Sequence, residues 1–219
     1  MRSEIVERMR GIYVIVDPEH TNNRNVIEVA EAAFSGGAST VQLRDKVSPK
    51  RNIVETATEI QKLANDTGRL FIMNDHADIA RIVASDGLHL GQKDISVEDS
   101  RVVLDDRQIV VTSNALVTEA EESERIGADY LAVGAMFPTN TKIGTRLAGL
   151  ETLREIRATT SAHIVAIGGI KESNLNAVLR AGADSICIAS AITKAEDVEA
   201  AARSLVNLFN HSAISKSKT

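Results

Sequence analysis

The chain has 219 residues, 43% of them hydrophobic and only 3% aromatic, and carries a formal net charge of −5 at pH 7. An acidic chain without a long Lys/Arg run argues against nucleic-acid binding, and the lack of an apolar run near the roughly 20 residues that span a bilayer argues against a membrane protein. The single cysteine and the mixed charges of the first ten residues, which contain no apolar signal-peptide core, lead us to expect a cytoplasmic protein.

Short apolar runs recur along the chain, and each predicts a strand. They lie at residues 12–16, 39–43, 70–73, 87–90, 108–112, 129–134, 163–167 and 184–189. Segments with apolar residues at i, i+3, i+4 and i+7 separate many of them, as over 26–34 and 53–64, and these predict helices. Strands that alternate with helices predict right-handed βαβ units and a parallel sheet.

The number of these units favours one architecture. Open sheets of the flavodoxin and Rossmann types use five and six strands, whereas eight units of about 27 residues predict a closed (β/α)8 TIM barrel. No linker or break in composition divides the chain. We therefore expect a single α/β barrel domain over residues 1–210 and a polar, frayed C-terminal tail over residues 211–219.

Two carboxylates follow neighbouring predicted strands, Asp75 after the third and Asp94 after the fourth. Functional groups of such barrels lie at the C-terminal ends of the strands, so these carboxylates can converge at the barrel mouth and hold Mg²⁺. The alternative for Asp75 is an N-cap of the helix that follows. Asp94 is harder to explain in that way, because Ser96 with Asp99 three residues later already marks a helix start.

Basic residues follow the second and sixth strands. Arg44 and Lys46 point to binding of phosphate oxygens, the alternative being a solvated loop of mixed charge. The segment FPTNTK (137–142) offers two threonine hydroxyls and Lys142, the alternative being an ordinary turn. Its continuation beyond residue 142 is long enough for a lid.

Small residues end the seventh and eighth strands. Gly168 and Gly169 allow close approach of the backbone, and Ser190 adds a hydroxyl, in the two loops where barrels commonly bind phosphate. Together with the basic residues, these loops indicate two anion sites and a pair of small-molecule substrates, at least one of them a diphosphate.

The remaining reactive residue types have structural interpretations. We expect Cys187 to fill the core and His89 to point into the barrel, and we expect His163 and His211 to lie at the surface. The sequence shows no Ser-His-Asp set, Cys/His metal cluster or Walker loop. Catalysis by a protein nucleophile is therefore not indicated.

Seven motifs, in the same order and approximate spacing, resemble those of the thiamine phosphate synthase family over nearly the whole chain. They are QLRDK (42–46), MND (73–75), DGLHLGQKD (86–94), GADYLAVG (127–134), FPTNTK (137–142), AIGGI (166–170) and AGAD with ASAI (181–192). The resemblance implies a Mg²⁺-dependent transferase of thiamine biosynthesis. It would join 4-amino-5-hydroxymethyl-2-methylpyrimidine diphosphate to 4-methyl-5-(2-phosphoethyl)thiazole through a pyrimidine carbocation and release pyrophosphate.

The resemblance also implies roles for individual residues. The pyrimidine diphosphate would be bound by Gln42, Arg44, Lys46, Asn74, Ser113 and Lys142. The thiazole phosphate would be bound by Thr139, Thr141, Gly169, Ala189 and Ser190. Mg²⁺ would be bound by Asp75 and Asp94, and the chemical step would depend most on Lys142, Ser113 and Arg44.

The chain departs from the family pattern in two places. After the fifth strand it reads VTSNAL (111–116), with Ala115 and Leu116 where the family usually has His-Thr, and Ala135 stands where Pro is common. Two alternatives share the fold, a thiazole tautomerase-like isomerase and a non-catalytic thiazole phosphate-binding protein. The first would not need the Arg/Lys set with paired carboxylates, and the second would be expected to lose Asp75, Asp94 or Lys142, all of which are present. The oligomeric state is not indicated.

Overall fold

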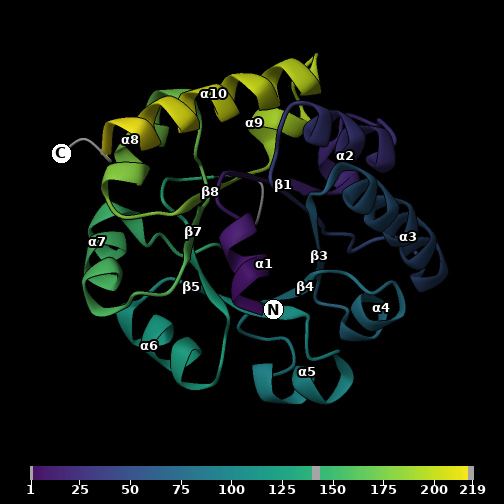
Figure 1. Ribbon diagram of the computed structural model, residues 1–219, viewed down its shortest axis with the longest axis horizontal. Coiled ribbons are helices and arrows are strands. Elements are labelled where there is room, and N and C mark those ends of the chain that lie inside the picture. Colours follow the sequence, from purple (N-terminus) through teal and green to yellow (C-terminus); the bar gives the residue numbers. More distant parts are fainter. Residues whose placement is uncertain (1, 140–143, 217–219) are drawn as a thin grey trace.

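The computed structural model describes residues 2–139 and 144–216, and eight parallel strands in it close into a barrel in chain order (Figure 1). The strands are β1 (Ile12–Val16), β2 (Thr40–Leu43), β3 (Leu70–Asn74), β4 (Gly87–Leu90), β5 (Ile109–Asn114), β6 (Tyr130–Gly134), β7 (Ile164–Ile167) and β8 (Ser185–Ile188). Each pairs with the next, and β8 closes the ring by pairing with β1 through Cys187 and Tyr13. The predicted (β/α)8 barrel is therefore confirmed.

Helices surround the barrel and connect its strands (Figure 1). Their bounds are α1 (Arg2–Arg8), the 3-10 turn η1 (Pro18–His20), α2 (Val26–Ser35), α3 (Lys50–Thr67), α4 (Ala77–Ile82), α5 (Val97–Val103), α6 (Val117–Arg125), α7 (Gly149–Thr159), α8 (Glu172–Arg180), α9 (Ser190–Thr193) and α10 (Val198–Lys216). Helix α10 continues through residue 216, so most of the segment expected to fray is helical. In the described ranges, no helix is long and apolar enough to cross a membrane.

The hydrophobic core has two layers, because successive side chains of a strand point to opposite faces. Side chains such as Tyr13, Ile72 and Tyr130 fill the inside of the barrel. Those that alternate with them, such as Val14 and Leu131, pack between the strands and the helices. This arrangement leaves the ends of the barrel as the places where polar groups can gather.

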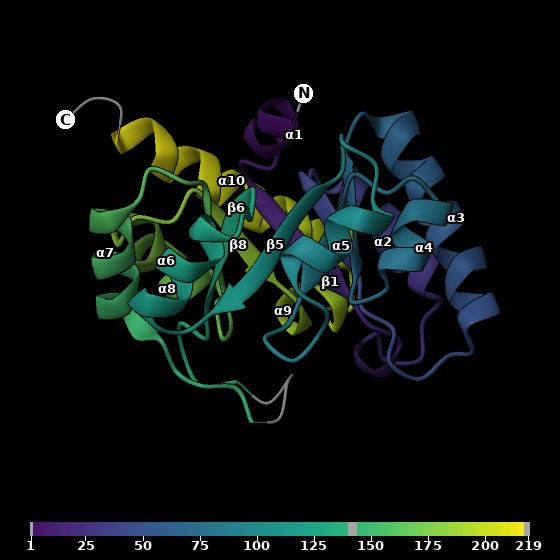
Figure 2. The same cartoon turned by 90° about the horizontal axis from the view of Figure 1, so that it is seen from below.

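Helix α1, which the sequence did not predict, covers the N-terminal end of the barrel. Val6 and Met9 pack into the interior cluster. The carbonyl of Met9 accepts hydrogen bonds from the hydroxyls of Ser39, at 2.8 Å, and Ser185, at 2.9 Å. Figure 2 shows α1 at one end of the molecule and the segment after β6 at the opposite end. The C-terminal ends of the strands therefore remain as the side where a substrate can enter.

The structure places two histidines and the single cysteine, and it differs from the sequence-based expectation for one of them. His163 was expected at the surface, but this was wrong, since it is 8% exposed and its Nε2 lies 2.8 Å from Ser185 Oγ under α1. His211 is exposed, as expected. Cys187 is buried in the interior cluster, as expected.

Candidate active site

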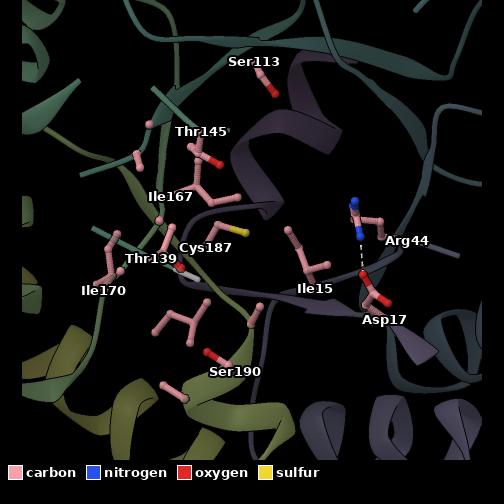
Figure 3. A pocket seen from close by; sticks show the side chains of 17 residues that line it. Ile15, Asp17, Arg44, Ser113, Thr139, Thr145, Ile167, Ile170, Cys187 and Ser190 are labelled. Atoms are coloured by element: carbon pink, nitrogen blue, oxygen red, sulfur yellow. Dashed lines mark hydrogen bonds and ion pairs between the residues drawn. The ribbon is translucent and has the colours of Figure 1, made fainter. Parts of the chain in front are cut away.

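A pocket of about 170 Å³ opens at the C-terminal end of the barrel (Figure 3). Residues that the sequence assigned to two different ligands line it together. They are Arg44, Ser113, Thr139, Gly169, Ala189 and Ser190. Ile15, Ile167 and Ile170 supply much of its apolar wall. The pocket thus combines an apolar interior with polar groups at its edges, which is the usual character of a small-molecule site.

Arg44 reaches this pocket from the end of β2, where it forms an ion pair with Asp17 through Nη1 (Figure 3). Asp17 follows β1 directly, is 2% exposed and also lines the pocket. The side chain of Arg44 is 22% exposed, so the alternative of a freely solvated loop does not hold for it. Asp17 was missed at the sequence level, although its place directly after a strand is the same signal that singled out Asp75.

Lys46 forms an ion pair with Asp75 across the ends of β2 and β3. Asp75 has a positive φ of 60°, and its N–H donates to the carbonyl of His89 at 2.8 Å. The N-cap of α4 is His76, which makes no capping hydrogen bond with its side chain. The alternative of Asp75 as that N-cap is therefore wrong, and its carboxylate lies instead at the rim, 12% exposed.

Asp94 lies in the exposed loop after β4. Its Oδ2 accepts from the N–H of Gly91 at 2.7 Å, and Gln92 of the same loop donates to the carbonyl of Ser113 at 2.7 Å. The expected helix start is confirmed, because Ser96 is the N-cap of α5 and its hydroxyl accepts from Asp99 N–H. Asp94 is thus not needed to begin that helix, and its loop is tied to the end of β5.

Polar side chains continue from the pocket into the top of the barrel. The amide of Gln42 donates to Asn74 Oδ1 at 3.4 Å, and both residues are buried. His89 Nε2 lies 2.9 Å from the hydroxyl of Ser113. His89 therefore points into the barrel, as expected, and it contacts one of the predicted substrate-binding residues.

The two glycines after β7 are required by the close approach of the chain segment that follows β6. Gly168 and Gly169 have φ values of 97° and 67°, and a Cβ on Gly169 would lie 2.7 Å from the carbonyl oxygen of Phe137. The carbonyl of Gly168 accepts from Phe137 N–H at 3.0 Å. The chain after β6 is therefore held directly against the glycine loop, and this contact forms one side of the pocket.

Ala115 and Leu116, which stand where the family usually has His-Thr, lie after β5 at the start of α6. Leu116 is the N-cap there, without a capping side chain, and it is 50% exposed. Glu119 substitutes by accepting from Ala115 N–H at 2.7 Å and from Arg146 at 2.5 Å. Burial opposes ionisation of Glu119, but these two donors outweigh it and keep the pKa of Glu119 below its usual value. Ser113 still faces the pocket, so the departure leaves that hydroxyl in place.

The remaining predicted site residues differ in how far the structure places them. Lys46, Asp75 and Asp94 lie at the same end of the barrel as the pocket but do not line it. Thr141 and Lys142 lie outside the described residues. Within residues 2–139 and 144–216, no group of three or more His, Cys, Asp or Glu side chains could hold a metal ion by itself.

Comparison with known proteins gives one consistent result. A family model described as thiamine monophosphate synthase matches residues 12–192. A thiamine-phosphate synthase of Shouchella clausii is 41% identical over 197 residues, covering 89% of this chain and 94% of that protein. One from Moorella thermoacetica is 42% identical over 196 residues, covering 89% and 93%. Among solved structures, a thiamine phosphate pyrophosphorylase from Pyrococcus furiosus superposes with a TM-score of 0.88 at 34% identity, covering 94% of this chain and 98% of that one.

Proposed function

This chain belongs to the thiamine monophosphate synthase family and shares its transferase activity, and on this premise we propose how its residues bind and join the two substrates. The substrates are 4-amino-5-hydroxymethyl-2-methylpyrimidine diphosphate and 4-methyl-5-(2-phosphoethyl)thiazole. The observation that carries the assignment is the pocket itself, since Arg44, Ser113 and Ser190 line one cavity although they lie at the C-terminal ends of three different strands.

The pyrimidine diphosphate lies toward β2, β3 and β5 in this proposal. Arg44 and Lys46 bind its phosphate oxygens, for which a guanidinium fork and an ammonium point charge are suited. Gln42, Asn74 and Ser113 hold the pyrimidine end, and the contact between His89 and Ser113 supports an oriented hydroxyl. Lys142 belongs to the same ligand by the family pattern.

The thiazole phosphate lies toward β6, β7 and β8. Thr139, Ala189 and Ser190 line that part of the pocket, and the positive φ of Gly169 leaves room for the phosphate beside the backbone. Backbone N–H groups at such loops bind phosphate without a basic side chain. Thr141 completes this set as a prediction from the sequence.

The carboxylates of Asp75, paired with Lys46, and of Asp94, in the loop after β4, both lie at the C-terminal end of the barrel, and these two oxygen ligands fit a hard cation such as Mg²⁺. Mg²⁺ is commonly bound by one or two carboxylates, with water and phosphate oxygens completing its shell, so a protein site of three or more ligands is not required. When bound, the ion would neutralise charge on the departing diphosphate.

The residues of the chain act mainly by position and charge. The bond between the pyrimidine methylene carbon and the diphosphate oxygen breaks, its electron pair leaves with the diphosphate, and the aminopyrimidine stabilises the resulting carbocation. Arg44, Lys46 and Lys142 stabilise the negative charge that develops on the leaving group. The thiazole nitrogen then donates its electron pair to the carbocation. The apolar wall of the pocket, including Ile15 and Ile167, excludes water from that cation.

The direct test is formation of thiamine phosphate from the two purified substrates with Mg²⁺, read as thiochrome fluorescence after oxidation. We expect signal that requires both substrates, is lost with EDTA and returns with excess Mg²⁺. Arg44→Met should abolish most of it, whereas Arg154→Met, at an exposed arginine paired with Glu151 on α7, should leave it unchanged. If no product forms, whichever substrate is added first, and the protein still binds the thiazole phosphate, the result would instead support an isomerase or a non-catalytic binding protein of the same fold. Cytoplasmic location remains a prediction from the sequence.

A further inference from the structure

We propose that Asp17 is a positioning residue of this site, which fixes the guanidinium of Arg44 before the diphosphate binds. The inference rests on the proposed role of Arg44 in binding the pyrimidine diphosphate. It concerns a residue at the end of β1, a strand to which neither the sequence motifs nor the proposed substrate contacts assign a polar group.

Asp17 is only 2% exposed, and both of its carboxylate oxygens have polar partners within the protein. Oδ1 accepts from the N–H of Glu19 at 3.0 Å, which begins the turn η1. Oδ2 pairs with Nη1 of Arg44, and Nδ1 of His20 lies 3.5 Å from the same oxygen. A buried carboxylate is costly unless it is hydrogen-bonded and paired with a cation. The fold therefore holds Asp17 in one orientation, and the pair with Arg44 follows from it.

The segment that follows Asp17 is hydrogen-bonded to helix α9, which begins at Ser190. The hydroxyl of Thr193 donates to the carbonyl of His20 at 2.8 Å. Arg24 forms a second hydrogen bond to the same residue, donating from Nη2 to the carbonyl of Thr193 at 2.6 Å. Thr193 is fully buried at the end of α9. The segment next to Asp17 is therefore held against α9, whose first residue, Ser190, is proposed to bind the thiazole phosphate. The position of Arg44 is in this way set relative to the second substrate.

The pair leaves Arg44 able to bind a ligand. A guanidinium carries five N–H donors, so Arg44 can hold Asp17 through Nη1 and bind phosphate oxygens through the others. Figure 3 shows the pair at one side of the pocket, with Thr139 and Ile170 across the cavity from it. Long side chains lose conformational freedom when they bind a ligand, and a side chain that is already fixed loses less. Asp17 therefore lowers the cost of diphosphate binding without touching the reacting atoms.

A double-mutant cycle tests this role. Asp17→Asn keeps the shape of the side chain, and we expect it to raise KM for the pyrimidine diphosphate roughly threefold to tenfold. KM for the thiazole phosphate should stay within twofold, which a general loosening of the pocket would not produce. In an Arg44→Met background, Asp17→Asn should add no further increase, because Asp17 acts through Arg44. An unchanged KM in the single variant, or an equal increase in the Arg44→Met background, would overturn the proposal.

Controls separate the possible failures. Asp184→Asn is the matched variant, because Asp184 also pairs with arginines, Arg10 and Arg157, but at the N-terminal end of the barrel, and it should leave both KM values unchanged. If Asp17→Asn does not fold, Asp17→Ser supplies the same test, since its hydroxyl can still accept from Glu19 N–H. An Arg44→Met variant with unchanged KM would refute the proposed role of Arg44 and this inference together. A raised KM in Arg44→Met with none in Asp17→Asn would refute this inference alone.

Discussion

The ammonium of Lys46 pairs with the carboxylate of Asp75, which joins a proposed phosphate-binding residue to a proposed metal ligand in the substrate-free protein. The two groups cannot both keep this contact and serve their proposed ligands fully. A cation on Asp75 competes with Lys46 for the carboxylate. An ammonium released by this competition would lie beside the diphosphate that the same cation accompanies. The ion pair therefore opposes metal binding until the diphosphate arrives.

The first prediction follows from that competition. Lys46→Met should tighten Mg²⁺ binding to the substrate-free protein by up to about fivefold, because a partly exposed ion pair contributes about 0.2–1 kcal/mol. Isothermal titration with Mg²⁺, or water-proton relaxation with Mn²⁺, measures this without turnover. The same variant should raise KM for the pyrimidine diphosphate.

A neighbouring lysine offers the control. Lys50 pairs with Asp78 at 2.7 Å on the outside of the barrel, so Lys50→Met should change neither metal affinity nor KM. Weaker or unchanged metal binding in Lys46→Met would contradict a competition between Lys46 and the cation for Asp75. Weaker binding would mean that Lys46 instead supports the metal site.

The second prediction concerns Gly169. Gly169→Ala should lower the free energy of unfolding by more than the roughly 1 kcal/mol that a positive φ costs an L-residue, because its Cβ would also meet the Phe137 carbonyl at 2.7 Å. It should also raise KM for the thiazole phosphate. Gly127→Ala isolates the first effect, since Gly127 has φ 86° and open space around it. Urea unfolding and steady-state kinetics give both quantities; equal losses of stability in the two variants would exclude the clash.

The sequence predicted the fold because its information is local and repeated. Each apolar run became a strand, and barrel closure then brought Arg44, Ser113 and Ser190 together although 146 positions separate the first from the last. Helix α1 was missed because its short, charged sequence shows no clear apolar face. Its burial depends on the barrel end that it covers.

The partners of the site residues were the part that could not be predicted. Asp17 and Arg44 are 27 positions apart, and Lys46 and Asp75 are 29 apart, so each pairing depends on which strand ends become neighbours. His163 was misplaced for the same reason. A single histidine before a strand has no periodic pattern, and its burial results from contacts with Ser185 and α1.

His163 also carries the third prediction, a loss of stability in acid. Burial lowers the pKa of His163 to about 4, against the opposing charge of Asp184. The unfolded chain, with the ordinary histidine pKa near 6.5, takes up this proton first, so the contribution of neutral His163 is complete above about pH 6.5 and is lost as the pH falls toward 4. Between pH 7.5 and 5 the native protein should lose about 2 kcal/mol more unfolding free energy than His163→Asn. Urea unfolding at the two pH values measures this, with exposed His211→Asn expected to behave as the native protein.

The fourth prediction tests whether Cys187 is a packing residue. Its thiol is 4% exposed, and burial raises its pKa well above the ordinary value, so it stays protonated and unreactive although it borders the pocket. Iodoacetamide at pH 8 should leave the native protein unmodified by mass spectrometry and add one equivalent in urea, because the chain has a single cysteine. Cys187→Ser should add none and should keep its turnover, since the proposed reaction uses no protein nucleophile. Rapid alkylation of the native protein, or loss of turnover in a variant with a native circular dichroism spectrum, would give the thiol a part in the reaction.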